Sequence, residues 1–246
     1  MRQIEKVRTA FQKLAVWGTE HEREFRVAGA THAWWHRDQL LSGLAWDNIA
    51  AAALLRAAGP PQSLLMLGLA GGTSLRILRH LLPELQITAV EIDRQIVELA
   101  DRHMNLAELG LKVHFADAYQ WLRGNTGRFD VVVDDVYGVT AEDVARPGAY
   151  DSGTRDALLG SVASEGLLVV NLVTGRGHRQ LQSSFRRFFR LNFPSASSVS
   201  TPAGANEALV GGGEIRNARA LAEWTAKFPQ ASDRWLWKKI RVQRLR

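Results

Sequence analysis

The sequence predicts a doubly wound α/β fold built on a mostly parallel sheet, and two observations carry this prediction. Apolar runs of strand length alternate with amphipathic stretches of helix length along most of the chain, a pattern typical of β-α-β units. One such run, residues 64–67, is followed directly by Gly68, and the next strand-like run, about twenty residues later, contains Glu91. A glycine turn after one strand and a carboxylate after the next indicate a ligand site at the carboxyl edge of a parallel sheet.

The remaining elements follow from apolar spacing and from turn residues. Near the N-terminus, Ile4, Val7, Phe11 and Leu14 have helical spacing, which predicts a short amphipathic helix, and a small hairpin is expected over residues 24–35. Further strands are expected at residues 112–116, 129–133, 166–172, 197–200 and 205–210, and helices at residues 44–58, 155–162, 178–191 and 218–228. The chain thus divides into an abbreviated helix and hairpin region (1–43), an α/β domain (44–230) and a basic C-terminal tail or strand (231–246).

Composition limits the class of protein. With 246 residues, of which 46% are hydrophobic, the chain can bury a full core, and without cysteine it has neither disulfides nor thiolate metal ligands. No apolar run approaches the roughly 18 residues that span a bilayer, and the N-terminus lacks the apolar stretch of a signal peptide. We therefore expect a cytoplasmic protein without membrane contact. His32 and His36 lie four residues apart, but in a strand-like stretch, where that spacing does not bring metal ligands together, so no metal site is predicted.

Charge is distributed unevenly along the chain. The net charge is +6, yet from Gly175 onward there are fourteen Lys or Arg against four acids, which leaves the first 174 residues with a net −4. An acidic ligand-binding part suits a cationic ligand. The basic C-terminal part is interpreted as a solvated surface in preference to a contact surface for nucleic acid.

The glycine turn also limits the type of nucleotide. The dinucleotide pattern G-x-G-x-x-G, placed on Gly68, requires glycines where this chain has Ala70 and Thr73. A pyrophosphate is therefore disfavoured relative to an adenosine that carries a thioether or sulfonium tail. Glu91 is expected to accept both ribose hydroxyls of such a ligand.

Four segments together resemble a known family. Residues 67–73, 90–93, 116–118 and 129–135 are similar to the corresponding motifs of the spermidine synthase-like branch of the S-adenosylmethionine methyltransferase fold, over roughly Trp46 to Val173. Ordinary methyltransferases of this fold mostly carry an acid two residues before the first glycine, where this chain has Met66. That difference favours the aminopropyltransferase branch.

The resemblance implies a function and a set of site residues. It implies a polyamine aminopropyltransferase that uses decarboxylated S-adenosylmethionine, without a metal, to alkylate a small-molecule amine, and it implies a homodimer. By this resemblance Asp135 is the catalytic acid that accepts the proton of the amine, Tyr137 assists, and Trp46 and Asp47 line the amine pocket. The nucleotide would be held by Gly68, Ala70, Gly71, Gly72, Glu91, Ile92, Asp117 and Ala118.

Two positions depart from the family pattern. Spermidine synthases generally carry aspartates where this chain has Gly71 and Gly138, and those two acids hold cationic groups of the substrates. Without them the grip on a diamine is weakened, because each close ion pair in a partly buried site contributes on the order of a few kcal/mol. Methyl transfer from S-adenosylmethionine remains the alternative activity, and a non-catalytic nucleotide-binding scaffold is the third interpretation.

Overall fold

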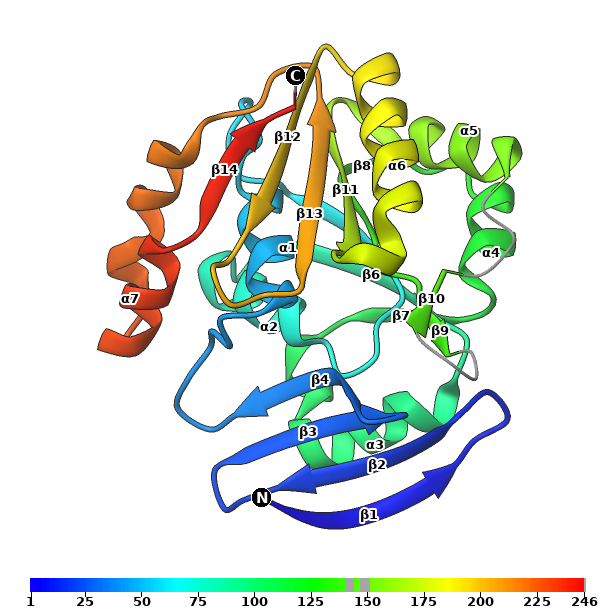
Figure 1. Ribbon diagram of the computed structural model, residues 1–246, viewed down its shortest axis with the longest axis vertical. Coiled ribbons are helices and arrows are strands. Elements are labelled where there is room, and N and C mark those ends of the chain that lie inside the picture. The colour runs from blue at the N-terminus through cyan, green and yellow to red at the C-terminus, as the bar shows by residue number, and fades with distance from the viewer. Residues whose placement is uncertain (140–143, 147–150, 246) are drawn as a thin grey trace.

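A computed structural model of the chain describes residues 1–139, 144–146 and 151–245. Within these ranges, a four-stranded antiparallel sheet lies beside the carboxyl edge of an eight-stranded sheet that is flanked by helices (Figure 1). A two-stranded ribbon, β9 (Gly138–Val139) with β10 (Val144–Ala145), lies near the same edge. The α/β architecture confirms the predicted fold class.

The N-terminal sheet consists of four consecutive strands. They are β1 (Arg2–Arg8), β2 (Lys13–Gly18), β3 (Glu22–Val27) and β4 (Ala30–His36), paired in the order β1-β2-β3-β4. The expected hairpin is formed by β3 and β4.

The prediction of an N-terminal helix over residues 4–14 is wrong. β2 buries alternate residues, Leu14 and Val16, which is the period of a strand. Between β1 and β2, the Thr9 hydroxyl accepts hydrogen bonds from the backbone N–H groups of Phe11 (3.1 Å) and Gln12 (3.1 Å), and this turn interrupts any helix. The apolar residues at helical spacing are thus divided between two strands and a turn.

The central sheet has the order β14-β12-β13-β11-β8-β5-β6-β7. Its parallel part comprises β5 (Ser63–Leu67), β6 (Gln86–Glu91), β7 (Lys112–Phe115), β8 (Phe129–Asp134) and β11 (Val162–Val173). Antiparallel strands complete it: β12 (Ser195–Ser200), β13 (Asn206–Gly212) and β14 (Arg241–Arg244). The basic C-terminal segment therefore contributes an edge strand.

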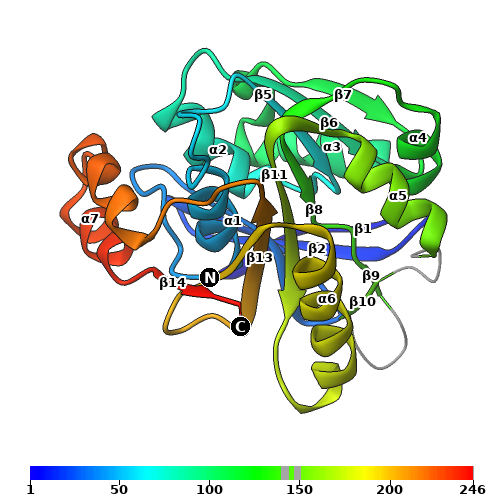
Figure 2. The same cartoon turned by 90° about the horizontal axis from the view of Figure 1, so that it is seen from above.

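Helices cover both faces of this sheet (Figure 2). One core holds α1 (Ala45–Ala53), α2 (Thr73–Leu81), α3 (Arg94–Met104) and the 3-10 turn η1 (Leu106–Leu109), and the other holds α4 (Ala118–Gly124), α5 (Ser152–Gly160) and α6 (Arg179–Asn192). Two further 3-10 segments, η2 (Arg176–His178) and η3 (Ala218–Lys227), and the helix α7 (Ala231–Lys238) complete the described elements. The helix predicted near residues 218–228 is thus a 3-10 segment.

Polar contacts join the N-terminal sheet to the α/β body. The Thr73 hydroxyl, at the start of α2, donates to the Trp34 carbonyl (2.8 Å) and accepts from the Trp34 N–H (2.9 Å). Farther along, Glu5 on β1 pairs with His103 (2.7 Å) and Arg102 (3.2 Å) on α3. The small sheet is thereby held against the helices that follow β5 and β6, beside the predicted ligand edge.

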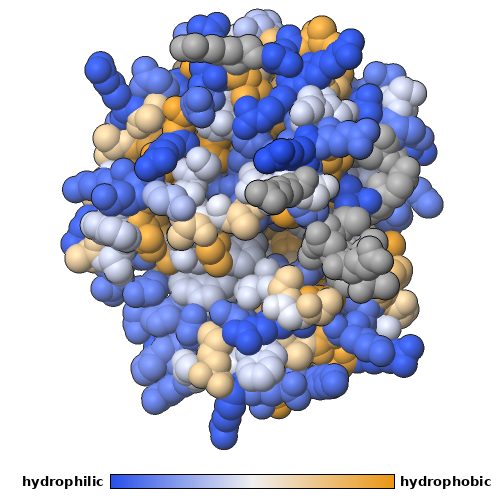
Figure 3. Space-filling view, in the orientation of Figure 1, coloured by the Kyte–Doolittle hydropathy of each residue, from blue (hydrophilic) through white to orange (hydrophobic). Residues whose placement is uncertain are grey.

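The surface shows no extended apolar area on the face seen in Figure 3, where hydrophilic residues surround small apolar patches. Among the described residues, no helix combines the length and the apolar character needed to cross a membrane.

Candidate active site at the carboxyl edge of the sheet

The glycine turn after β5 touches the end of β8. Gly68 has a φ of +81°, and a Cβ at this position would lie 2.6 Å from the backbone oxygen of Asp135. The Asp135 N–H donates to the Leu67 carbonyl (2.9 Å). Glycine is therefore required both for the backbone conformation and for the close approach. The same contact places the predicted base beside the predicted nucleotide turn.

Glu91, at the end of β6, organises this turn. One carboxylate oxygen accepts from the N–H groups of Leu69 (3.0 Å) and Ala70 (3.1 Å), and the other accepts from the Asp93 N–H (3.0 Å). The side chain is buried. A carboxylate has about four acceptor positions, so these three bonds leave acceptor capacity for a ribose hydroxyl. Contact with ribose remains a prediction, and support of the turn is a role that sequence reasoning missed.

The other predicted nucleotide residues lie along the same edge. Asp117 caps α4, and one of its oxygens accepts from the N–H groups of Tyr119 (3.0 Å) and Gln120 (2.9 Å). Ala118 is buried in the first turn of that helix, whereas Ile92 exposes 41% of its surface directly after β6. An exposed aliphatic side chain at a strand end offers an apolar surface to a flat ring.

Asp135 is held by a polar side chain of the neighbouring strand. The Asn171 amide, on β11, donates to an Asp135 carboxylate oxygen (2.7 Å), and the Asn206 amide donates in turn to the Asn171 side-chain oxygen (3.2 Å). Burial raises the pKa of Asp135 to about 7, while the Asn171 hydrogen bond and the Arg146 charge oppose that rise and the charge of Asp134 adds to it. A carboxyl with this pKa can exchange a proton with a substrate near neutral pH.

Asp134 has a different environment from its neighbour. Its carboxylate is fully buried and receives Arg146 (2.7 Å) and the Tyr119 hydroxyl (3.2 Å). Arg146 also donates to the backbone oxygens of Asp134 (3.1 Å) and Asn171 (2.6 Å). Asp134 is thus a partner of a buried guanidinium rather than a group open to substrate.

Tyr137 lies at the carboxyl edge of the sheet, and its hydroxyl is hydrogen-bonded to backbone groups of β11. The hydroxyl donates to the Asn171 carbonyl (2.7 Å) and accepts from the Val173 N–H (3.2 Å), and burial raises the pKa of the phenol. Its ring packs 4.9 Å from the Arg146 guanidinium. The structure therefore gives Tyr137 a packing role; assistance to Asp135 remains a prediction.

The predicted amine-pocket pair lies at the start of α1. Trp46 is buried, and the fully buried Asp47 carboxylate accepts from the N–H groups of Ser42 (3.1 Å) and Gly43 (2.7 Å). Burial raises the pKa of Asp47 to about 7, although the bonds from Ser42 and Gly43 lower it and the charge of Asp233 raises it. Asp47 holds the segment that leads from the small sheet to α1, and its contact with an amine remains a prediction.

The two glycines that depart from the family pattern differ in their surroundings. A Cβ on Gly71 would lie 2.5 Å from the Ala33 Cβ and 2.6 Å from the Met104 sulfur, so no side chain fits there without movement of β4 or α3. Gly138, in β9, is exposed. Glu142, an acid four residues after Gly138 in the sequence, lies outside the described residues.

Sequence reasoning missed Arg146, Asn171, Tyr119 and Asn206. Asn171 carried a signal, since it is an amide near the end of an otherwise apolar strand. No feature of the sequence indicated that Arg146 would lie at this site. Within the described part of the chain, no cluster of three His, Asp or Glu could hold a metal ion.

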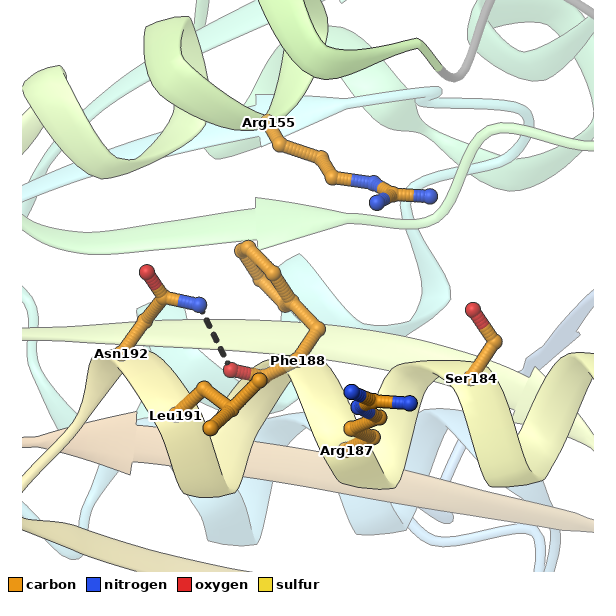
Figure 4. Close-up of a pocket in the computed structure, with 6 residues that line it drawn as sticks. All are labelled: Arg155, Ser184, Arg187, Phe188, Leu191 and Asn192. Carbon is orange, nitrogen blue, oxygen red and sulfur yellow. Dashed lines mark hydrogen bonds between the residues drawn. The ribbon is translucent and has the colours of Figure 1, made fainter.

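A separate hollow lies between α5 and α6 and shares no residue with this edge (Figure 4). It measures about 350 Å³ and is lined by Arg155, Ser184, Arg187, Phe188, Leu191 and Asn192. Asn192 is turned back to the Phe188 carbonyl (2.8 Å).

Comparison with known proteins gives related folds and one related sequence. No family model matches the chain. A probable polyamine aminopropyl transferase from Bifidobacterium longum (strain NCC 2705) is 34% identical over 101 residues, which are 41% of this chain. The match spans 22% of that relative's length.

Solved structures match over much more of the chain. A probable spermidine synthase from Corynebacterium glutamicum ATCC 13032 superposes with a TM-score of 0.74 at 15% identity, covering 100% of this chain and 92% of the other. The fold is a spermidine synthase-like methyltransferase fold. A spermidine synthase in complex with the transition state analogue AdoDATO gives 0.68 at 15% identity (93% and 80% covered), and human methyltransferase-like protein 13 in complex with SAH gives 0.58 at 22% identity (79% and 88% covered). The resemblance inferred from the sequence motifs is thereby confirmed for the fold.

Proposed function

We propose that this protein is a transferase that binds an S-adenosyl nucleotide and alkylates a small-molecule amine, with aminopropyl transfer from decarboxylated S-adenosylmethionine as the reaction. The observation that carries the proposal is the position of Asp135, a carboxyl with a pKa of about 7 whose backbone touches the glycine turn at Gly68. The related sequence named as a probable polyamine aminopropyl transferase and the ligands named for two structural neighbours support it.

The chemistry follows from the proton balance of an amine nucleophile. A protonated amine has no free electron pair, so Asp135 first accepts one proton from the ammonium. The nitrogen then attacks the carbon attached to the sulfonium, the carbon–sulfur bond breaks, and its electron pair leaves with sulfur as a neutral thioether. Asp135 thereby carries the proton that the amine lost. Orientation of the two reactants at the sheet edge supplies several kcal/mol of the acceleration.

Methyl transfer from S-adenosylmethionine is the second candidate, and Gly71 favours it. The carboxylate that spermidine synthases generally carry at this position would repel the carboxylate of a methionine tail. Here the contacts with Ala33 and Met104 leave no room for any side chain. An acid is thus absent from the position where it would repel a methionine carboxylate.

Calorimetric titration distinguishes these functions. The ligands are decarboxylated S-adenosylmethionine, methylthioadenosine, S-adenosylmethionine and S-adenosylhomocysteine. Preference for the first two supports aminopropyl transfer, and preference for the last two supports methylation. Absence of binding by all four ligands would contradict both functions, and binding without turnover of any amine would favour the non-catalytic nucleotide-binding scaffold.

A further inference from the structure

The helix α7 buries one side and exposes the other. On the buried side, Trp237 is 2% exposed, and its indole N–H donates to the Leu221 carbonyl (2.7 Å). Trp235, two residues earlier, exposes 60% of its surface. Helical spacing places Trp235 on the same face as Lys238 and as Lys239, directly after the helix, and both lysines are exposed. The outer face of α7 therefore presents an aromatic ring and two ammonium groups.

Further cations follow in β14, the edge strand that pairs with β12. Arg241 and Arg244 are exposed on this strand. Residues 234–246 contain no acid. Asp233, the last acid of the sequence, is fully buried, and its two carboxylate oxygens accept backbone N–H groups of the segment before α1 (3.1 Å each). A series of exposed cations of this kind attracts polyanions.

The exposed indole is positioned by one of these cations. The Lys239 ammonium lies 5.3 Å from the centre of the Trp235 ring, a distance at which the electron-rich face of an indole attracts a cation. An ammonium covers only part of a ring of this size, and most of the residue stays exposed. The ring thus offers a flat apolar surface on which another ring can stack, beside groups that bind phosphates.

We propose that α7 and β14 form a binding surface for single-stranded nucleic acid, made of Trp235, Lys238, Lys239, Arg241 and Arg244. A base stacks on the indole and the cations bind the phosphates, which are the two contacts that hold single strands without reading their sequence. The basic C-terminal segment is therefore more than a solvated surface, and the exposed ring is the reason.

The same residues fit a membrane less well. Trp235 is the single exposed large apolar residue among residues 231–245, which leaves little apolar surface to insert between lipids. The surface also lies on the side of the molecule away from the ribbon β9–β10 (Figures 1 and 2) and shares no residue with the candidate active site. The proposal is therefore independent of the proposed transferase.

Fluorescence anisotropy of a labelled uridine homopolymer tests the proposal. The RNA has about 20 nucleotides, more than the roughly 4–16 that a small binding fold covers. It is titrated with the full chain at salt concentrations between about 50 and 200 mM. Each phosphate contact with a single strand contributes about 0.7 to the slope of log affinity against log salt, so contacts of all four cations predict a slope of about −3. The affinity should therefore fall roughly 50-fold over this range.

Variants separate stacking from charge. Trp235→Ala should weaken binding about 5- to 150-fold, the range that stacking of one base supplies, and should leave the salt slope unchanged. Trp235→Phe keeps an aromatic ring and should lose less affinity. The double variant Lys238→Gln with Arg241→Gln should weaken binding and reduce the slope to about half. Its matched control, Lys6→Gln with Arg8→Gln, removes two exposed cations from β1 and should bind like the unmodified protein.

Three results would overturn the proposal. The first is absence of RNA binding at the lowest salt concentration, or unchanged affinity in a Trp235→Ala variant that unfolds like the unmodified protein. The second is an equal loss of affinity in the β1 control, which would assign the binding to the net charge of +6 rather than to this surface. The third comes from sedimentation with vesicles of phosphatidylglycerol and phosphatidylcholine. Vesicle binding that depends on Trp235, with RNA binding that does not, would assign the surface to a membrane.

Discussion

Removal of the Asn171 amide should move the pH dependence of the reaction to higher pH. Asn171 donates a 2.7 Å hydrogen bond to Asp135, and this bond lowers the pKa of a carboxyl that burial has raised to about 7. A hydrogen bond to a charged group contributes about 1.5–3 kcal/mol, and one pKa unit corresponds to about 1.4 kcal/mol. In Asn171→Leu we therefore expect the pKa of Asp135 to rise by about 1 to 2 units.

The consequence for activity has a definite sign. The base works only as a carboxylate, so kcat/KM of the unmodified protein should rise with pH through about 7. In Asn171→Leu the ionised fraction at pH 7 falls from about one half to between about 1% and 10%. The rate at that pH should drop roughly 5- to 50-fold and recover as the pH is raised.

Two measurements and one control make this test specific. The profile of kcat/KM against pH gives the apparent pKa of the free protein, and the carbon-13 shift of the Asp135 carboxyl reports the same titration without turnover. Asn206→Ala removes only the bond to the Asn171 oxygen, so its shift should be smaller. An unchanged profile in folded Asn171→Leu would refute the assignment of Asp135 as the base or of Asn171 as the residue that tunes it.

Three further predictions concern other parts of the site and of the fold. Glu91→Gln should weaken nucleoside binding at least tenfold, about 1.4 kcal/mol, because an amide accepts fewer bonds from the turn and the ribose; unchanged calorimetric affinity in a folded variant would contradict this. Asp135→Asn should abolish turnover with little change in nucleotide affinity, whereas loss of turnover in Asp134→Asn alone, with Asp135→Asn still active, would reverse the two assignments. Hydrogen bonding to His103 lowers the pKa of Glu5, so the contribution of this ion pair to the free energy of unfolding is present above pH 4.5 and is lost as the pH falls through the lowered pKa. The free energy of urea unfolding of Glu5→Gln should therefore depend less on pH in the acid range. Identical pH profiles for the variant and the unmodified protein would exclude the ion pair as a source of this dependence.

The central sheet was predictable because its signals are local. The apolar strand of residues 64–67, the glycine after it and the acid at the end of the next strand each act within a few residues. The N-terminal region was not, since four apolar residues at helical spacing also fit two short strands joined by a turn. The hydrogen bonds of the Thr9 turn and the pairing of β1 with β2 decide between these alternatives, and both depend on contacts that spacing alone does not express.

The site divides in the same way. Gly68, Glu91 and Asp135 could be placed together because strand ends of a parallel sheet meet at one edge. The position of Arg146 could not be predicted, because this residue follows the short strand β10 and belongs to no strand of the parallel sheet. The role of Asn171 could in principle be predicted from the sequence, since a buried amide near a strand end requires hydrogen-bond partners.

The contact between Gly68 and Asp135 joins the turn after β5 to the end of β8 through backbone atoms alone. Asp135, the predicted base, is attached to the glycine turn through backbone atoms, by the bond from its N–H to the Leu67 carbonyl and by the close approach at Gly68. A side chain at residue 68 would have to displace the backbone of Asp135. Other contacts at this edge come from other parts of the chain, since Ala33 on the N-terminal sheet closes the space at Gly71 and Arg146, directly after β10, donates to the Asp134 carboxylate. The backbone contact at Gly68 is therefore set by the sheet itself, whereas the contacts at Gly71 and Asp134 depend on segments outside the parallel strands.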